Sequence, residues 1–168
     1  MNLEEAKYKF IQEWGVLGSS WGINRAMAQI HALLLLSPNS KTTDEVMEDL
    51  KISRGNANMN IRALIDWGLV FKEYIPGERK EYFYAEKDFW IVTRQIAKER
   101  RKRELLPILE VLDDVSKAEI DGKTEDGKEF LKVTKDIDSF IGKIDNLVEM
   151  ASKSDQNWFL RLLTRFMK

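Results

Sequence analysis

Residues 53–68 of the chain read SRGNANMNIRALIDWG, and this segment has the marks of a single helix. Ser53 is of a type that often caps a helix N-terminus, and Gly68 is of the type that often follows a helix end. The apolar residues recur at three- and four-residue intervals: Ala57, Ile61, Leu64 and Ile65. Such spacing places them on one face that can pack inward. The opposite face is rich in arginine and asparagine and carries no acidic residue before Asp66.

A shorter helix is predicted just before this segment. Thr42 or Thr43 can cap it, Asp44 and Glu45 suit its N-terminus, and it should end near Lys51. Two helices joined by a tight turn form a helix-turn-helix.

Beyond Gly68 the sequence takes on the character of β-strands. Residues 69–75 and 80–85 are rich in β-branched and aromatic side chains, and residues 76–79 read PGER, a turn. A β-hairpin that directly follows a helix-turn-helix is a wing, so we expect a winged helix-turn-helix.

The remaining segments are expected to be helical. The first two predicted ranges are 3–17 and 24–36, with Asn24 as a possible N-cap of the second. A long helix is predicted over 88–118, with a kink or break at Pro107, and a heptad segment from Phe130 to Ala151. A last helix should begin at Ser154 or Asp155, with an apolar face of Phe159, Leu162, Leu163, Phe166 and Met167. Gly15, Gly18 and Gly22 are expected to weaken the first helix. The predicted class is mainly α, with a two-stranded hairpin wing and N- and C-terminal dimerisation helices.

Composition argues against most enzyme classes. The 168 residues include no cysteine and one histidine, His31, and they show neither a phosphate-binding loop nor a dinucleotide-binding motif. We therefore expect no catalytic residue, no metal site and no cofactor. Residues 1–9 lack an apolar signal core, and no apolar run could span a bilayer, so a cytoplasmic protein is expected.

The polar face of the second helix suits duplex DNA. Arginine matches guanine O6 and N7, asparagine matches adenine N6 and N7, and such a helix enters the major groove by its first turns. The predicted DNA-binding residues are Thr42, Ser53, Arg54, Asn56, Asn58, Met59, Arg62, Arg79 and Lys80. The net charge of −1 argues mildly against DNA and leaves an alternative open, a winged-helix protein–protein adaptor.

Several motifs together resemble the GbsR branch of the MarR-type winged-helix regulators. They are SRGNANMN at 53–60, DWGLV at 66–70, PGERKEY at 76–82, EWG at 13–15, LLLLS at 33–37 and ERRKREL at 99–105. The resemblance runs from the start of the chain to Pro107. It implies a homodimer on a pseudo-palindromic operator, often a repressor that a small molecule releases.

The sequence also suggests how such a regulator would be divided. Residues 1–22 and 88–168 would build the dimer, and residues 23–87 would bind DNA, with all three parts forming one unit. Four aromatic residues, Phe10, Trp14, Trp21 and Trp67, are candidates for an effector site, because aromatic faces attract quaternary ammonium groups. The alternative is that these side chains belong to the core.

Overall fold

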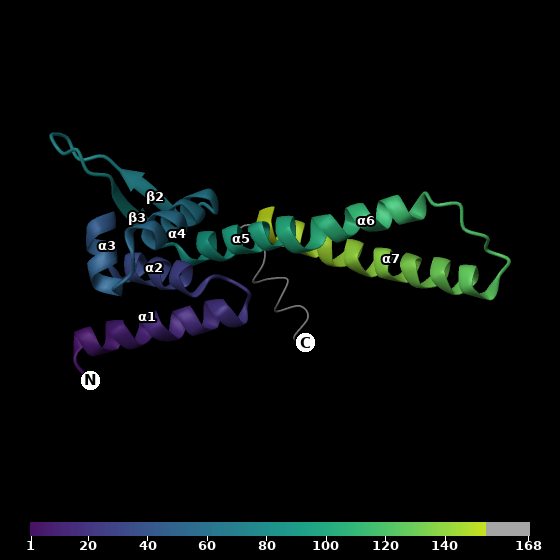
Figure 1. The fold of residues 1–168 in the computed structure, drawn as a ribbon, viewed down its shortest axis with the longest axis horizontal. Helices are drawn as coiled ribbons and strands as arrows, with labels where there is room; N and C mark the ends of the chain where they lie inside the picture. The colour runs from purple at the N-terminus through teal and green to yellow at the C-terminus, as the bar shows by residue number, and fades with distance from the viewer. Residues whose placement is uncertain (154–168) are drawn as a thin grey trace. The chain divides into compact units, whose positions relative to one another are not determined.

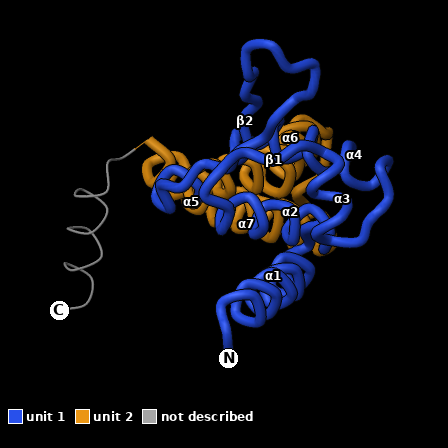
Figure 2. The backbone as a smooth tube through the Cα atoms, turned by 90° about the vertical axis from the view of Figure 1, so that its left-hand side faces the viewer, with its two compact units in different colours: residues 1–92 blue, residues 93–168 orange. Residues whose placement is uncertain are grey.

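The computed structural model describes residues 1–153, and the chain forms two compact units (Figure 2). The first unit holds residues 1–92, and the second begins at residue 93. The predicted last helix, from residue 154 onward, lies outside the described residues.

The first unit contains four helices, the start of a fifth, and a small sheet (Figure 1). Its elements are α1 Leu3–Ser20, α2 Arg25–Leu36, β1 Lys41–Thr42, α3 Thr43–Leu50, α4 Arg54–Asp66, β2 Val70–Glu73, β3 Tyr82–Ala85 and the first residues of α5 Phe89–Arg100. The predicted mainly α fold with a hairpin wing is confirmed.

Local capping chemistry explains where these helices begin. The side chain of Asn24 accepts hydrogen bonds from the amides of Ala26 and Met27, so the predicted cap of α2 is confirmed. Ser53 caps α4 by accepting a hydrogen bond from the amide of Asn56 at 3.3 Å, also as predicted. Each such contact satisfies an amide that the helix itself leaves unpaired.

The expected weakening of the first helix at its glycines is wrong for Gly15 and Gly18, since α1 continues through both. Both are buried where α1 packs on α2. A Cβ at Gly15 would lie 2.7 Å from Cγ of Gln29, and one at Gly18 would lie 2.5 Å from Cβ of Ala28. The glycines therefore allow the two helices to approach closely.

The sheet has one strand more than the sequence predicted. Its order is β1-β3-β2, all antiparallel, with Lys41 opposite Phe83 and Lys72 opposite Phe83 on the other side. A two-residue strand such as β1 carries too little pattern to be recognised from sequence.

The core of the first unit lies between α2, α3, α4 and the sheet. Its largest fully buried side chains are Ile30, Leu34, Val46, Ile61, Leu64, Val70 and Val92. Ile61 and Leu64 belong to the apolar face predicted for α4, so the opposite face of that helix is turned outward.

The second unit is a helical hairpin. It contains most of α5, a π-helical turn at Arg101–Leu105, α6 Leu106–Ser116 and α7 Glu125–Lys153. The helix therefore does not break at Pro107, which lies in the first turn of α6, and the distortion falls on the residues before it. Arg101 pairs with Asp145 at 2.5 Å and with Glu149 at 3.3 Å, which ties the turn to α7.

Candidate nucleic-acid interface

The turn between α3 and α4 is compact because of one residue. Lys51 ends α3 in the left-handed conformation, with φ of 54°, and its amide donates to the carbonyl of Met47. The amide of Ile52 donates to the same carbonyl at 3.2 Å. Two residues later Ser53 caps α4, so the chain reverses within three residues and sets α4 against α3.

The outward side of α4 presents a narrow set of exposed residues. We call Arg54, Gly55, Met59 and Arg62 the reader face, since all four are exposed and the last three lie along one line of the helix. Met59 is 60% exposed, which is unusual for a large apolar side chain. Within residues 1–153, Arg62 forms no ion pair. The reader face thus combines two arginines, one exposed methionine and one glycine, which has no side chain.

The two predicted asparagines lie beside the reader face and are half-buried. Oδ1 of Asn56 accepts a hydrogen bond from Nδ2 of Asn60 at 2.5 Å, and Oδ1 of Asn58 accepts one from Oγ1 of Thr43 at 3.3 Å. Their carbonyl oxygens already hold the local structure together. Contact with an adenine would require these bonds to rearrange.

A carboxylate that sequence analysis did not single out lies beside the reader face. Oδ1 of Asp44, near the start of α3, pairs with Nη2 of Arg54 at 2.5 Å, and its Oδ2 lies 3.8 Å from Nζ of Lys80 in the wing. Asp44 therefore joins the helix-turn-helix to the wing through two cations. The sequence signal was only an acid in the first turn of α3, which is equally explained by the helix dipole.

The wing supplies the remaining predicted cations. Figure 1 shows the long connection between β2 and β3. Arg79 and Lys80 belong to this connection and are exposed. Two contacts brace this hairpin: Nζ of Lys72 donates to Glu81 at 2.6 Å, and the hydroxyl of Tyr82 donates to Glu78 at 2.6 Å. The hydrogen bond to Glu78 raises the pKa of Tyr82.

Thr42, also predicted to bind DNA, serves the fold instead. It is 6% exposed, and its hydroxyl exchanges hydrogen bonds with Glu45 in a capping box at the start of α3. Glu45 also accepts a hydrogen bond from the Thr42 amide, and these bonds lower the pKa of the carboxyl. The single hydroxyl hydrogen of Thr42 is already donated to Glu45, so a contact with a phosphate oxygen would require this bond to break.

Of the four predicted effector residues, the structure brings two together. Phe10 and Trp14 stack at 5.3 Å between ring centroids, and Trp14 also contacts His31 at 6.4 Å and Phe89 at 6.2 Å. Trp21 is half-exposed at the end of α1, whereas Trp67 is buried. Phe10 and Phe89 are 40% and 59% exposed, so the cluster around Trp14 is a partly exposed aromatic contact.

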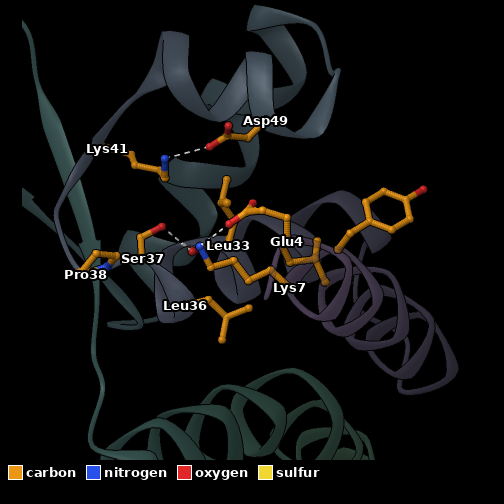
Figure 3. Close-up of a pocket in the computed structure, with 10 residues that line it drawn as sticks. Glu4, Lys7, Leu33, Leu36, Ser37, Pro38, Lys41 and Asp49 are labelled. Carbon is orange, nitrogen blue, oxygen red and sulfur yellow. Dashed lines mark hydrogen bonds and ion pairs between the residues drawn. The ribbon is translucent and has the colours of Figure 1, made fainter. Parts of the chain in front are cut away.

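A pocket of about 260 Å³ opens between α1, the end of α2, β1 and α3 (Figure 3). Two ion pairs line it, Lys7 with Glu4 and Lys41 with Asp49, each at 2.9 Å. Its remaining lining is mixed: Tyr8, Ile11, Leu33, Leu36, Ser37 and Pro38. None of the four predicted effector residues lines this pocket.

The described part of the chain offers few other chemical sites. No cluster of histidine, cysteine or acidic side chains within residues 1–153 could hold a metal ion. None of the helices described is both long and apolar enough to cross a membrane. The exposed face of the helix-turn-helix with its wing is thus the main candidate site.

Comparison with known proteins agrees with this picture. The chain matches no protein-family model. It is 28% identical to the HTH-type transcriptional repressor GbsR of Bacillus subtilis strain 168 over 88 residues, which are 52% of this chain and 48% of that repressor. The match therefore spans about half the length of that relative.

Two solved structures are also similar. One, a crystal structure of a transcriptional regulator, aligns with a TM-score of 0.66 at 19% identity, covering 88% of this chain and 95% of the other. A MarR transcriptional regulator from Methanosarcina mazei Go1 aligns with a TM-score of 0.34 at 19% identity, covering 97% of this chain and 82% of the other. The first shows a common fold. The sequence match, over 88 residues, is to a repressor of the GbsR branch that the motifs resemble, and it supports the resemblance drawn from them.

Proposed function

We propose that the chain is a transcriptional regulator that binds specific sequences in double-stranded DNA. The observation that carries this proposal is the reader face, where Arg62 and Met59 project from a helix whose other side is locked into the core. Such a helix fits the major groove, which is wide enough to admit it. The similar protein GbsR is a transcriptional repressor, which supports a regulatory function and gives no support to catalysis.

The side chains divide into roles by their chemistry. Arg62 is free to pair with a guanine or a phosphate, and Met59 suits the methyl group of thymine. Arg79 and Lys80 of the wing would contact phosphates or enter the minor groove. Arg54 can join them only by leaving Asp44, so its contribution is partly offset within the protein.

We also propose that the chain acts as a homodimer. Among residues 93–153 no apolar side chain is buried, although α7 carries three heptads of apolar residues. Phe140 and Leu147, both at heptad positions, are 62% and 60% exposed. A helical hairpin cannot be stable with its apolar stripe in water, and a second copy could cover it.

The dimer would set the spacing of the operator. Two copies related by a twofold axis present two reader faces, and half-sites then lie about 34–36 Å apart, one turn of DNA. By analogy with the repressor GbsR, the regulator would block transcription by occupying such a site.

The proposal also includes release of the regulator from DNA by a small molecule. The pocket beside Lys7 and Lys41 joins α1 to α3, so an occupant would touch both an end of the chain proposed for dimerisation and the helix-turn-helix. A ligand that favours one spacing of the two reader faces would shift the population toward it. The paired charges in the pocket suit a small zwitterion, whereas the aromatic cluster at Trp14 suits a quaternary ammonium ion.

The decisive experiment measures binding to DNA as a function of salt. A fluorescent mixed-sequence duplex is titrated with the full chain at 50 to 200 mM salt, followed by selection of bound genomic fragments. A DNA-binding regulator loses affinity steeply as salt rises and enriches a two-fold symmetric site. A protein adaptor would show no affinity for duplex DNA at any salt concentration, and that result would overturn the proposal. Titration of the complex with candidate zwitterions and quaternary amines tests release.

A further inference from the structure

Gly55 occupies an unusual place in α4. It is exposed, lies in the first turn of the helix, and sits one turn before Met59 and two turns before Arg62 on the reader face. A Cβ built at this position meets no heavy atom within 4 Å. Its backbone is helical, without a positive φ, so every ordinary residue could adopt its conformation.

Three other glycines inside helices of the described residues have a reason within the fold. Gly15 and Gly18 let α1 approach α2, as shown above. At Gly127, a Cβ would lie 2.1 Å from the carbonyl oxygen of Asp121, so only glycine fits against that carbonyl. Gly55 has no comparable neighbour, and neither has Gly142 in α7; of these two, Gly55 is the one that lies on the reader face.

Glycine within a helix destabilises it relative to alanine, because it loses more backbone freedom on folding. Nothing inside the protein offsets this loss at Gly55. On an exposed face with a reading role, a missing side chain lets something outside approach the backbone, which is a common role of glycine at binding surfaces.

We propose that duplex DNA packs directly against the main chain of α4 at Gly55, in the space that a Cβ would fill. This inference rests on the proposed function, and it adds a contact in which shape matters more than charge. Since Met59 and Arg62 lie along the same line of the helix, DNA seated on Gly55 brings both side chains against the groove floor or its edge. Gly55 is then a specificity-determining position although it has no side chain.

The test compares Gly55→Ala with a matched control, Gly142→Ala. Gly142 is also a helical glycine, in α7, and a Cβ there likewise meets nothing within 4 Å. It lies at neither core position of the heptads, so it is remote from the apolar stripe. Both variants are measured for thermal unfolding and for binding to a mixed-sequence duplex and to a selected fragment.

Both substitutions should raise Tm by about 1–4 °C, as expected for glycine to alanine in a helix of a protein this size. Gly55→Ala should nevertheless bind DNA about tenfold or more weakly, because one methyl group is enough to disturb a packed contact. Gly142→Ala should bind like the unchanged protein. Loss on both duplexes places the sugar–phosphate backbone at Gly55, and loss on the selected fragment alone places a base edge there; either supports the inference.

Two results count against the inference, and they are distinguishable. If the unchanged protein binds duplex DNA and Gly55→Ala binds equally well, the close contact does not exist while the proposed function stands. If the unchanged protein itself binds no duplex at 50 mM salt, the proposed function fails and takes the contact with it.

Discussion

Replacing Asp44 with Asn should strengthen binding to DNA of any sequence and make it more sensitive to salt. The Asp44 carboxylate holds Arg54 at 2.5 Å and lies 3.8 Å from Lys80, so it occupies two cations that could otherwise meet phosphates. Asparagine keeps the size of the side chain and removes the charge. Arg54 is 62% exposed and Asp44 is 49% exposed, so this pair adds little to folding and the variant should remain stable.

The size of the effect follows from the charge removed. Each cation that neutralises a phosphate contributes about −0.9 to the slope of log K against log salt. Asp44 carries one unit of charge, so its removal should steepen that slope by about 0.9. Between 50 and 200 mM salt, affinity of the variant should fall about 3.5-fold more than that of the unchanged protein.

The assay is fluorescence anisotropy of a mixed-sequence duplex at four or more salt concentrations. Asp138→Asn on α7 is the control, since Asp138 is an exposed aspartate without an ion pair among residues 1–153 and the substitution changes net charge equally. The control should leave the slope unchanged. Equal slopes for Asp44→Asn and the control would show that Asp44 is not near the bound DNA, and the pairing would then have no part in recognition.

Three further outcomes are expected. Arg62→Ala should cost about 1–3 kcal/mol of binding at one position of a selected site, whereas Arg79→Ala should weaken all sequences alike and flatten the salt slope by about 1; competition assays against point-substituted sites distinguish the two patterns. Phe140→Glu should shift the chain from dimer to monomer in light scattering at micromolar concentration, and a dimer mass for this variant would contradict the assignment of α7. His31, 3% exposed, has its pKa lowered from 6.5 to about 4 by burial, so the free energy of unfolding should fall as pH drops through this window, by about 3 kcal/mol in total. Urea unfolding of His31→Leu from pH 7 to pH 4 should lack that part of the decline, and identical pH profiles would refute it.

Features of the fold that depend on local chemistry could be predicted from the sequence. A serine or asparagine side chain caps the helix that follows it, so Asn24 and Ser53 locate the starts of α2 and α4 without knowledge of the rest. The wing could also be predicted, because segments rich in β-branched and aromatic residues flank a proline–glycine turn. These signals together are specific enough to identify the winged helix.

Features that depend on a neighbour distant in sequence could not be predicted from it. Gly15 has the sequence signature of a helix break, and only the approach of Gln29 on α2 shows why the helix continues. Asn58 is of a residue type that can contact bases, and nothing in the sequence indicates that Thr43, fifteen residues earlier, donates a hydrogen bond to its Oδ1. The pairing of Asp44 with Arg54 is of the same kind, since one turn of helix-turn-helix geometry brings together residues ten apart.

The pairing at Asp44 and the open position at Gly55 point to the same mode of recognition. With a net charge of −1 and Arg54 held by a carboxylate, long-range attraction to phosphate is reduced. Much of the affinity for an operator would then come from close fit, which a glycine in the first turn of α4 permits, and from two copies binding one site. A protein built this way would bind most DNA weakly, through salt-dependent contacts, and bind firmly only where both half-sites fit.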